Sequence, residues 1–97
     1  MGKLKQLAEA AADFYQVPFE GLTSRNRSAI YTRPRHHCQW IANDAGIKIS
    51  VIAEFWKQDR SSVHYGCKIV NLRIERNEYE KLELKKFMQY ARKFIKR

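Results

Sequence analysis

Residues 49–74 read ISVIAEFWKQDRSSVHYGCKIVNLRI, and this stretch decides the fold. Its first part places apolar residues on one helical face, at Ile49, Ile52, Ala53 and Trp56. Its second part repeats that spacing at Val63, Cys67, Val70 and Ile74. Asp59 lies between the two parts, where a helix N-cap is expected. The stretch therefore predicts a helix-turn-helix, with a short helix from about Ile49 to Lys57 and a longer one from Asp59 to about Ile74.

The start of the longer helix carries side chains that suit DNA. In a helix-turn-helix the second helix enters the major groove, and its first residues meet base edges. The residues available outside the apolar stripe are Asp59, Arg60, Ser61, Ser62, His64, Tyr65 and, further along, Lys68. Arginine can bond guanine bidentately, serine can donate or accept, and a helix N-terminus attracts phosphate. Many helical domains contain such a corner, so the prediction of a DNA-contacting surface needs support from the rest of the chain.

The residues before this stretch also have helical spacing. One apolar stripe predicts a first helix and consists of Leu4, Leu7, Ala8, Ala11, Phe14 and Tyr15. Pro18 and Gly21 interrupt the pattern, and a single turn is expected around Phe19 to Leu22. A further helix is expected from about Arg33 to Ala45. Pro34 would then lie in its first turn, where a missing N–H group costs nothing.

The chain is strongly basic, with 19 Lys and Arg residues against 10 acids and a net charge of +9. Residues 23–32 lack a strong period and predict a basic loop. No acid occurs between Gly21 and Asn43, whereas this window holds Arg25, Arg27, Arg33 and Arg35. Such a field favours polyanions, with nucleic acid as the first expectation and an anionic membrane surface as the second. For these arginines, phosphate contact and a solvated basic stretch both remain open.

The C-terminal part forms a separate amphipathic pattern. We divide the chain into residues 1–76, the helix-turn-helix domain, and residues 77–97, a basic amphipathic helix. The stripe of that helix consists of Leu84, Phe87, Met88, Ala91, Phe94 and Ile95. Three interpretations remain open: the stripe covers the core, it docks a protein partner or a second copy of the chain, or it lies on anionic lipid.

Several other classes of protein are disfavoured. No segment approaches the roughly 18 apolar residues that span a membrane, and the first residues lack the apolar centre of a secretion signal. Two cysteines make no disulfide framework, so we expect a cytoplasmic, nucleoid-associated protein. The conceivable metal ligands are His36, His37, Cys38, His64 and Cys67. Both cysteines fall on apolar stripes, so we expect no metal. The acids are few and scattered, so we expect neither an enzyme nor a cofactor.

Short motifs recur in an order that a known family shares. Ser24-Arg25-Asn26-Arg27 precedes Arg33-Pro34-Arg35, Asp59-Arg60-Ser61-Ser62-Val63 follows, and Ala12-Asp13-Phe14-Tyr15-Gln16-Val17 lies upstream. The chain thereby resembles the C-terminal DNA-binding domain (domain IV) of DnaA, the bacterial chromosomal replication initiator family. That family carries Ser-Lys-x-Arg, Arg-Pro-Arg and Asp-His-Thr-Thr-Val in this order. The motifs cover about Leu4 to Leu72 and leave the C-terminal helix outside the resemblance.

The resemblance implies a helical, Trp-repressor-like fold that binds a short box at replication origins. It implies that Arg27 enters the minor groove from a loop, that Arg35 and His36 reach major-groove bases, and that residues 59–62 form the edge of the recognition helix. This chain departs from the family at Arg60 in place of His, at Ser61 and Ser62 in place of Thr, and at His36 in place of Gln. These changes suggest a different box. The chain has no Walker A glycine loop, and so nothing that resembles the family's ATPase.

We therefore expect an all-α protein with a helix-turn-helix and an extra C-terminal helix. We expect it to bind double-stranded DNA sequence-specifically at an initiator-box-like site, in replication initiation or its regulation. A free-standing domain of this kind also suggests a phage or mobile-element protein. The alternative is a protein-binding adaptor that regulates replication or transcription without reading DNA. A DNA reader would weaken steeply with salt and keep its sequence preference, which distinguishes the two.

Overall fold

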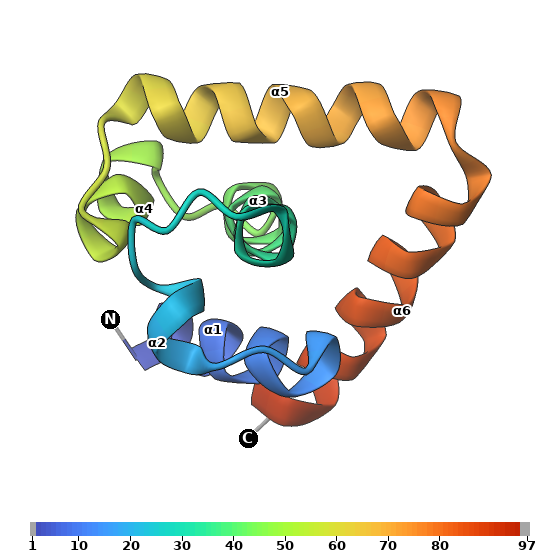
Figure 1. The fold of residues 1–97 in the computed structure, drawn as a ribbon, viewed down its shortest axis with the longest axis horizontal. Helices are drawn as coiled ribbons and strands as arrows, with labels where there is room; N and C mark the ends of the chain where they lie inside the picture. Colours follow the sequence, from blue (N-terminus) through green and yellow to red (C-terminus); the bar gives the residue numbers. More distant parts are fainter. Residues whose placement is uncertain (1, 96–97) are drawn as a thin grey trace.

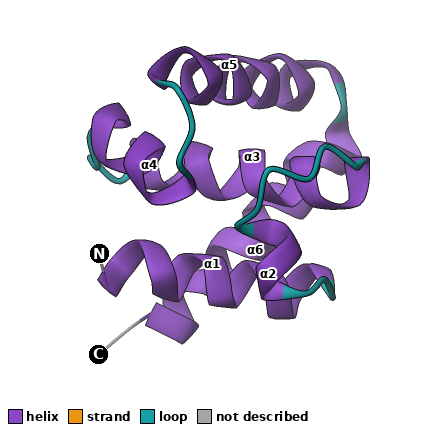
Figure 2. Cartoon of the chain, turned by 60° about the vertical axis from the view of Figure 1, so that its left-hand side comes forward, coloured by secondary structure: helices purple, strands orange, loops and turns teal. Residues whose placement is uncertain are grey.

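Helix α3 (Ala29–Asp44) runs through the middle of the molecule, and the other helices surround it (Figure 1). The structure is a computed structural model that describes residues 2–95, without the side chains of Phe94 and Ile95. The other helices are α1 (Gly2–Tyr15), α2 (Phe19–Leu22), α4 (Ile49–Trp56), α5 (Arg60–Arg76) and α6 (Glu78–Ile95). Helices α5 and α1 pack on opposite sides of α3 (Figure 2). The described residues contain no strand, so the predicted all-α class is confirmed.

The core forms where the apolar stripes of these helices meet. Its largest fully buried side chains include Trp56 of α4, Val63 of α5 and Phe87 of α6. The centroids of the Phe87 and Phe14 rings lie 5.4 Å apart, so α1 and α6 share one aromatic cluster. Cys38 and Cys67 are buried and unpaired, as their positions on apolar stripes predicted. No group of three His, Cys, Asp or Glu residues in the described chain could hold a metal ion.

Helix α3 begins earlier than the sequence pattern predicted. We expected a loop through residue 32, but the helix starts at Ala29, and the backbone carbonyl of Ser28 accepts from the N–H groups of Tyr31 and Thr32, both at 2.9 Å. No residue of the first turn is fully buried, so this turn shows no apolar period in the sequence. Pro34 consequently lies inside the helix rather than in its first turn. Proline has no N–H group to donate to the carbonyl of Ile30, four residues earlier. Ile30 is 60% exposed to water.

The helix-turn-helix forms close to its predicted limits. Helix α4 ends at Trp56, Lys57 adopts the left-handed conformation with φ of 55°, and α5 begins at Arg60. Asp59 occupies the N-cap position with an extended backbone. Its side chain, however, makes no hydrogen bond to the first turn, contrary to our expectation. Its backbone carbonyl accepts from the N–H of Ser62 at 3.0 Å instead, which leaves the carboxylate at the exposed edge of α5.

The C-terminal helix α6 leaves the end of α5 at Asn77 and runs back to α1 (Figure 1). The carbonyl oxygen of the Asn77 side chain accepts from the N–H groups of Tyr79 and Glu80, at 2.9 and 3.1 Å, and so caps α6. The stripe of Leu84, Phe87 and Ala91 is buried against the rest of the molecule. This geometry matches core cover, and it leaves that stripe unavailable to a partner, a second copy or lipid. The side chains of residues 94–95, and residues 96–97, lie outside the described part.

None of the helices in residues 2–95 combines the length and the apolar character needed to cross a bilayer.

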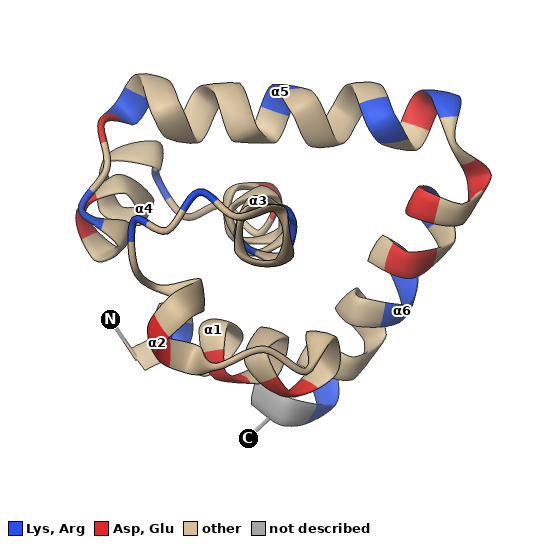
Figure 3. Cartoon of the chain, in the orientation of Figure 1, with Lys and Arg blue, Asp and Glu red and all other residues tan. Residues whose placement is uncertain are grey.

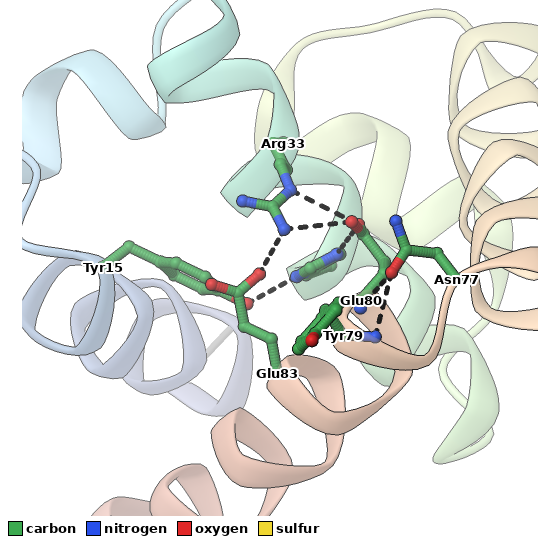
Figure 4. A network of polar contacts seen from close by, with 7 residues as sticks. Tyr15, Arg33, Asn77, Tyr79, Glu80 and Glu83 are labelled. Carbon is green, nitrogen blue, oxygen red and sulfur yellow. Dashed lines mark hydrogen bonds and ion pairs between the residues drawn. The ribbon is translucent and has the colours of Figure 1, made fainter.

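A partly buried polar network joins α1, α3 and α6 (Figure 4). The Tyr15 hydroxyl donates to Nδ1 of His37, and Nε2 of His37 donates to the Glu80 carboxylate at 2.9 Å. Arg33 donates to the same carboxylate at 2.9 Å and pairs with Glu83 at 2.5 Å. Burial lowers the pKa of His37 and outweighs its hydrogen bond to Glu80, so the folded protein holds this imidazole neutral.

Acid should therefore destabilise the protein through its histidines. Burial lowers the pKa of both His36 and His37, so below the ordinary histidine pKa of about 6.5 the unfolded chain binds protons that the folded chain does not. The free energy of unfolding should fall as the pH is lowered from about 6.5 towards 4. Urea unfolding at several pH values measures this slope. The variant His37→Gln should make the slope shallower, because the lowered pKa of His36 then remains as the contribution of these two histidines. A flat wild-type profile would contradict the assignment.

Candidate nucleic-acid interface

A groove of about 700 Å³ lies where the loop before α3 approaches the turn between α4 and α5. It is lined by Arg25, Arg27, Thr32, Arg35, His36, Lys57, Gln58, Asp59, Ser61, Ser62 and Tyr65. The groove thus unites the arginine-rich loop and the start of α5, which lie more than thirty positions apart in the sequence. Most of the DNA-contacting residues predicted from the sequence line it. Arg33, Arg60, His64 and Lys68 do not.

The loop at residues 24–28 has a defined shape although it is not helical. The Ser24 hydroxyl donates to the carbonyl of Gly21 at 2.8 Å and accepts from the N–H of Asn26 at 3.1 Å. The Asn26 side chain in turn accepts from the N–H of Ser28 at 2.8 Å. Arg27 is exposed and forms no hydrogen bond or ion pair with any residue in the described part of the chain. The loop therefore presents this guanidinium to an outside acceptor.

The first turns of α5 present a polar, exposed face beside the loop. Arg60, Ser61 and Ser62 are exposed, as are His64, Tyr65 and Lys68 further along, whereas Val63, Gly66 and Cys67 face the core. The N–H groups that open a helix have no acceptor inside it, so the start of α5 offers donors and a positive dipole end to an anion. Tyr65 is 61% exposed, which places an aromatic ring on the same surface.

The charge on this surface is mostly positive. Figure 3 shows basic positions on the loop, at the end of α4 and at the start of α5, close together in space. Asp59 is the one acid among the groove's lining residues. Lys57 also lines the groove and was not predicted from the sequence, although its place in the tight turn of the helix-turn-helix is a signal for it. A phosphate in this groove would meet Arg27 and Lys57 with little opposing charge.

Arg35 lines the groove, but its side chain also binds the end of α2. Only 3% of it is exposed, and its guanidinium donates from Nε to the carbonyl of Leu22 at 2.9 Å and from Nη2 to that of Gly21 at 3.1 Å. Burial lowers the pKa of this guanidinium. In the free protein Arg35 thus ties α3 to the end of α2, and these two bonds engage Nε and Nη2 of its guanidinium.

Arg33 also has partners that its local sequence did not reveal. Its guanidinium binds Glu80 and Glu83 of α6, and the hydrogen bond that it donates to Glu80 raises the pKa of Arg33. The absence of an acid between residues 21 and 43 had suggested an unpaired arginine. The acids come instead from α6, so Arg33 serves the partly buried network and lies outside the groove.

His36 lines the groove as a neutral side chain. Its imidazole packs on Gly66 so closely that an added Cβ there would approach Cδ2 to 2.7 Å. Burial, followed by the charges of Arg73, Arg35 and His37, lowers the pKa of His36 to about 4. The side chain therefore offers a neutral donor or acceptor to a ligand, and no positive charge for a phosphate at neutral pH.

Comparison with known proteins confirms the resemblance in sequence. No family model matches the chain. It is similar to the chromosomal replication initiator protein DnaA of Onion yellows phytoplasma (strain OY-M), with 25% identity over 93 residues. That stretch is 95% of this chain and 18% of the other protein, so the chain spans less than a fifth of its length. Because the similarity takes in nearly the whole chain, our expectation that the C-terminal helix lies outside it was wrong.

Proposed function

We propose that this chain binds double-stranded DNA sequence-specifically, at an initiator-box-like site, in replication initiation or its regulation. One observation carries the proposal: a single groove brings together the exposed Arg27 of the loop and the first turns of α5. Two separate elements that meet duplex DNA from one face can follow adjacent grooves, as a recognition helix and a basic arm do in other helix-turn-helix proteins. The similarity to a replication initiator supports the same class of ligand.

In this proposal α5 enters the major groove at its N-terminal end. Arg60 can bond the O6 and N7 atoms of guanine bidentately, and Ser61 and Ser62 can donate to or accept from base edges or phosphates. Arg27 reaches into the adjacent minor groove, where a narrow A·T-rich segment attracts a guanidinium. Because neither serine has the methyl group with which threonine contacts a thymine methyl, the preferred box should differ from that of the DnaA family.

A selection of bound duplexes from a random pool tests the proposal directly. A specific reader should enrich one box, bind it about 10³-fold or more tightly than scrambled duplex, and weaken steeply as salt rises. An adaptor that recognises only proteins would enrich nothing. Absence of duplex binding at low salt would exclude the proposed function.

The variant Arg27→Ala should lose about 1–3 kcal/mol of specific binding, because it removes an exposed guanidinium that has no hydrogen bond or ion pair within the described residues. Fluorescence anisotropy on the selected box and on a scrambled duplex measures the loss. The matched variant Ser62→Ala removes one hydroxyl on the α5 side and should lose less. Equal affinities of Arg27→Ala and the wild-type chain would remove Arg27 from the interface and leave the fold assignment intact.

A further inference from the structure

Among the described residues, one side-chain hydrogen bond links the loop at residues 24–28 to the turn before α5. Nη2 of Arg25 donates to the backbone carbonyl of Lys57 at 2.9 Å, across 32 positions of sequence. Arg25 lies in the loop two residues before Arg27, and Lys57 lies in the turn three residues before Arg60. The left-handed backbone of Lys57 ends α4, and its carbonyl is the acceptor that the Arg25 guanidinium meets.

The other contacts of the loop fix its shape and its base, but they do not fix its distance from α5. The carbonyl of Leu22, just before the loop, accepts from Arg35 at 2.9 Å and from the indole N–H of Trp56 at 3.2 Å. The bonds among Ser24, Asn26 and Ser28 then shape the loop internally. Among the hydrogen bonds of the described residues, the bond from Arg25 to Lys57 is the one that joins the far part of the loop to the turn of the helix-turn-helix.

We propose that Arg25 is a positioning residue that sets the spacing between the minor-groove contact of Arg27 and the major-groove contacts at the start of α5. This inference rests on the proposed DNA-binding function and assigns Arg25 a task other than the phosphate contact that we expected from the sequence. Successive base pairs lie about 3.4 Å apart, so a shift of the loop by that distance would move Arg27 to a neighbouring base pair. A guanidinium holds such a distance better than an ammonium, because its donors are planar and fixed, whereas lysine has a flexible stem.

The charge-conserving variant Arg25→Lys isolates this task. The box selected by the wild-type chain is first divided into two parts. In one part Arg27→Ala no longer prefers particular bases, and in the other part it still does. Duplexes with one base pair inserted or removed between these parts are then bound by each variant. The wild-type chain should lose about tenfold or more in affinity on either change, the usual range for a disrupted site. The affinities of Arg25→Lys for the altered and the original duplexes should differ by less than about threefold.

Two controls separate positioning from charge and from folding. Arg27→Ala should lose sequence preference in its part of the box, whereas Arg25→Lys should keep the preference in both parts and lose only the spacing. Thermal unfolding of Arg25→Lys should match the wild-type chain, because residue 25 is exposed. Together these results would support the spacing role.

Two other results would overturn it. If Arg25→Lys keeps the wild-type spacing requirement, the guanidinium bond does not set the spacing between the contacts of Arg27 and those of α5. Arg25→Ala could instead lower the salt dependence by the slope of about 0.9 that belongs to one phosphate contact, with the spacing requirement intact. Absence of duplex binding by the wild-type chain would exclude the proposed DNA-binding function itself, so the two failures are distinguishable.

Discussion

Replacement of Glu80 with alanine should lower the free energy of unfolding by about 3–4 kcal/mol, the largest effect that we expect from one substitution. The residue is 6% exposed, and its carboxylate accepts from Arg33 and from His37, each at 2.9 Å. Removal of the carboxylate would leave the fully buried His37 with a donor that has no acceptor, and would loosen α6 from α3. Urea unfolding at neutral pH, followed by far-ultraviolet circular dichroism, measures the change.

Helix α6 offers a matched control for this experiment. Glu78 begins the same helix but is exposed, so Glu78→Ala should change the free energy of unfolding by less than about 0.5 kcal/mol. Burial raises the pKa of Glu80, but the hydrogen bonds from Arg33 and His37 outweigh it and lower that pKa overall. The stabilisation by Glu80 is therefore present above the ordinary glutamate pKa of about 4.3 and is lost as the pH falls through the lower, folded value. Equal losses in both variants at neutral pH would contradict the role of the network.

Replacement of Arg35 with alanine should cost about 2–3 kcal/mol of stability, the second largest effect. The change removes two charge-assisted hydrogen bonds to backbone carbonyls and leaves a gap between α3 and the end of α2. It should also weaken DNA binding, because the loop that carries Arg27 begins at those carbonyls. Thermal and urea unfolding give the stability, and anisotropy at a temperature where the variant is folded gives the binding.

The comparison with Arg27→Ala shows whether Arg35 supports the fold or reads a base. Arg27 is exposed, so its loss should affect binding and leave the free energy of unfolding within about 0.5 kcal/mol. Arg35→Ala should affect stability first. If Arg35→Ala is as stable as the wild-type chain but has lost its sequence preference, the result would support the base contact that the resemblance implied. It would contradict the structural role of Arg35.

The apolar spacing of the sequence was sufficient to predict the helix-turn-helix. Trp56 and Val63 are almost completely buried, and strong burial on one face produces the period that locates α4 and α5. The same reasoning failed at the start of α3, where none of residues 29–32 is fully buried and the cap at Ser28 uses only backbone atoms. A turn that buries little leaves no period in the sequence.

The roles of the arginines could not be predicted from their neighbours along the chain. Arg33 pairs with acids 47 and more positions away, and Arg35 binds carbonyls on another helix. A count of local charge cannot detect either partner, because both depend on how the helices pack. Arg27 was expected in a loop and is exposed there, but its DNA contact remains a prediction.

The aromatic cluster between α1 and α6 also determines when the chain can finish folding during its synthesis. Phe14 contacts Phe87 and Tyr90, which a ribosome adds roughly 4–15 s later at ordinary rates of synthesis. Throughout that interval the apolar stripe of α1 has no α6 to cover it and is open to chaperones and proteases. The domain can close only after the last turns of α6 have emerged, so its folding cannot be completed while α6 is still being synthesised.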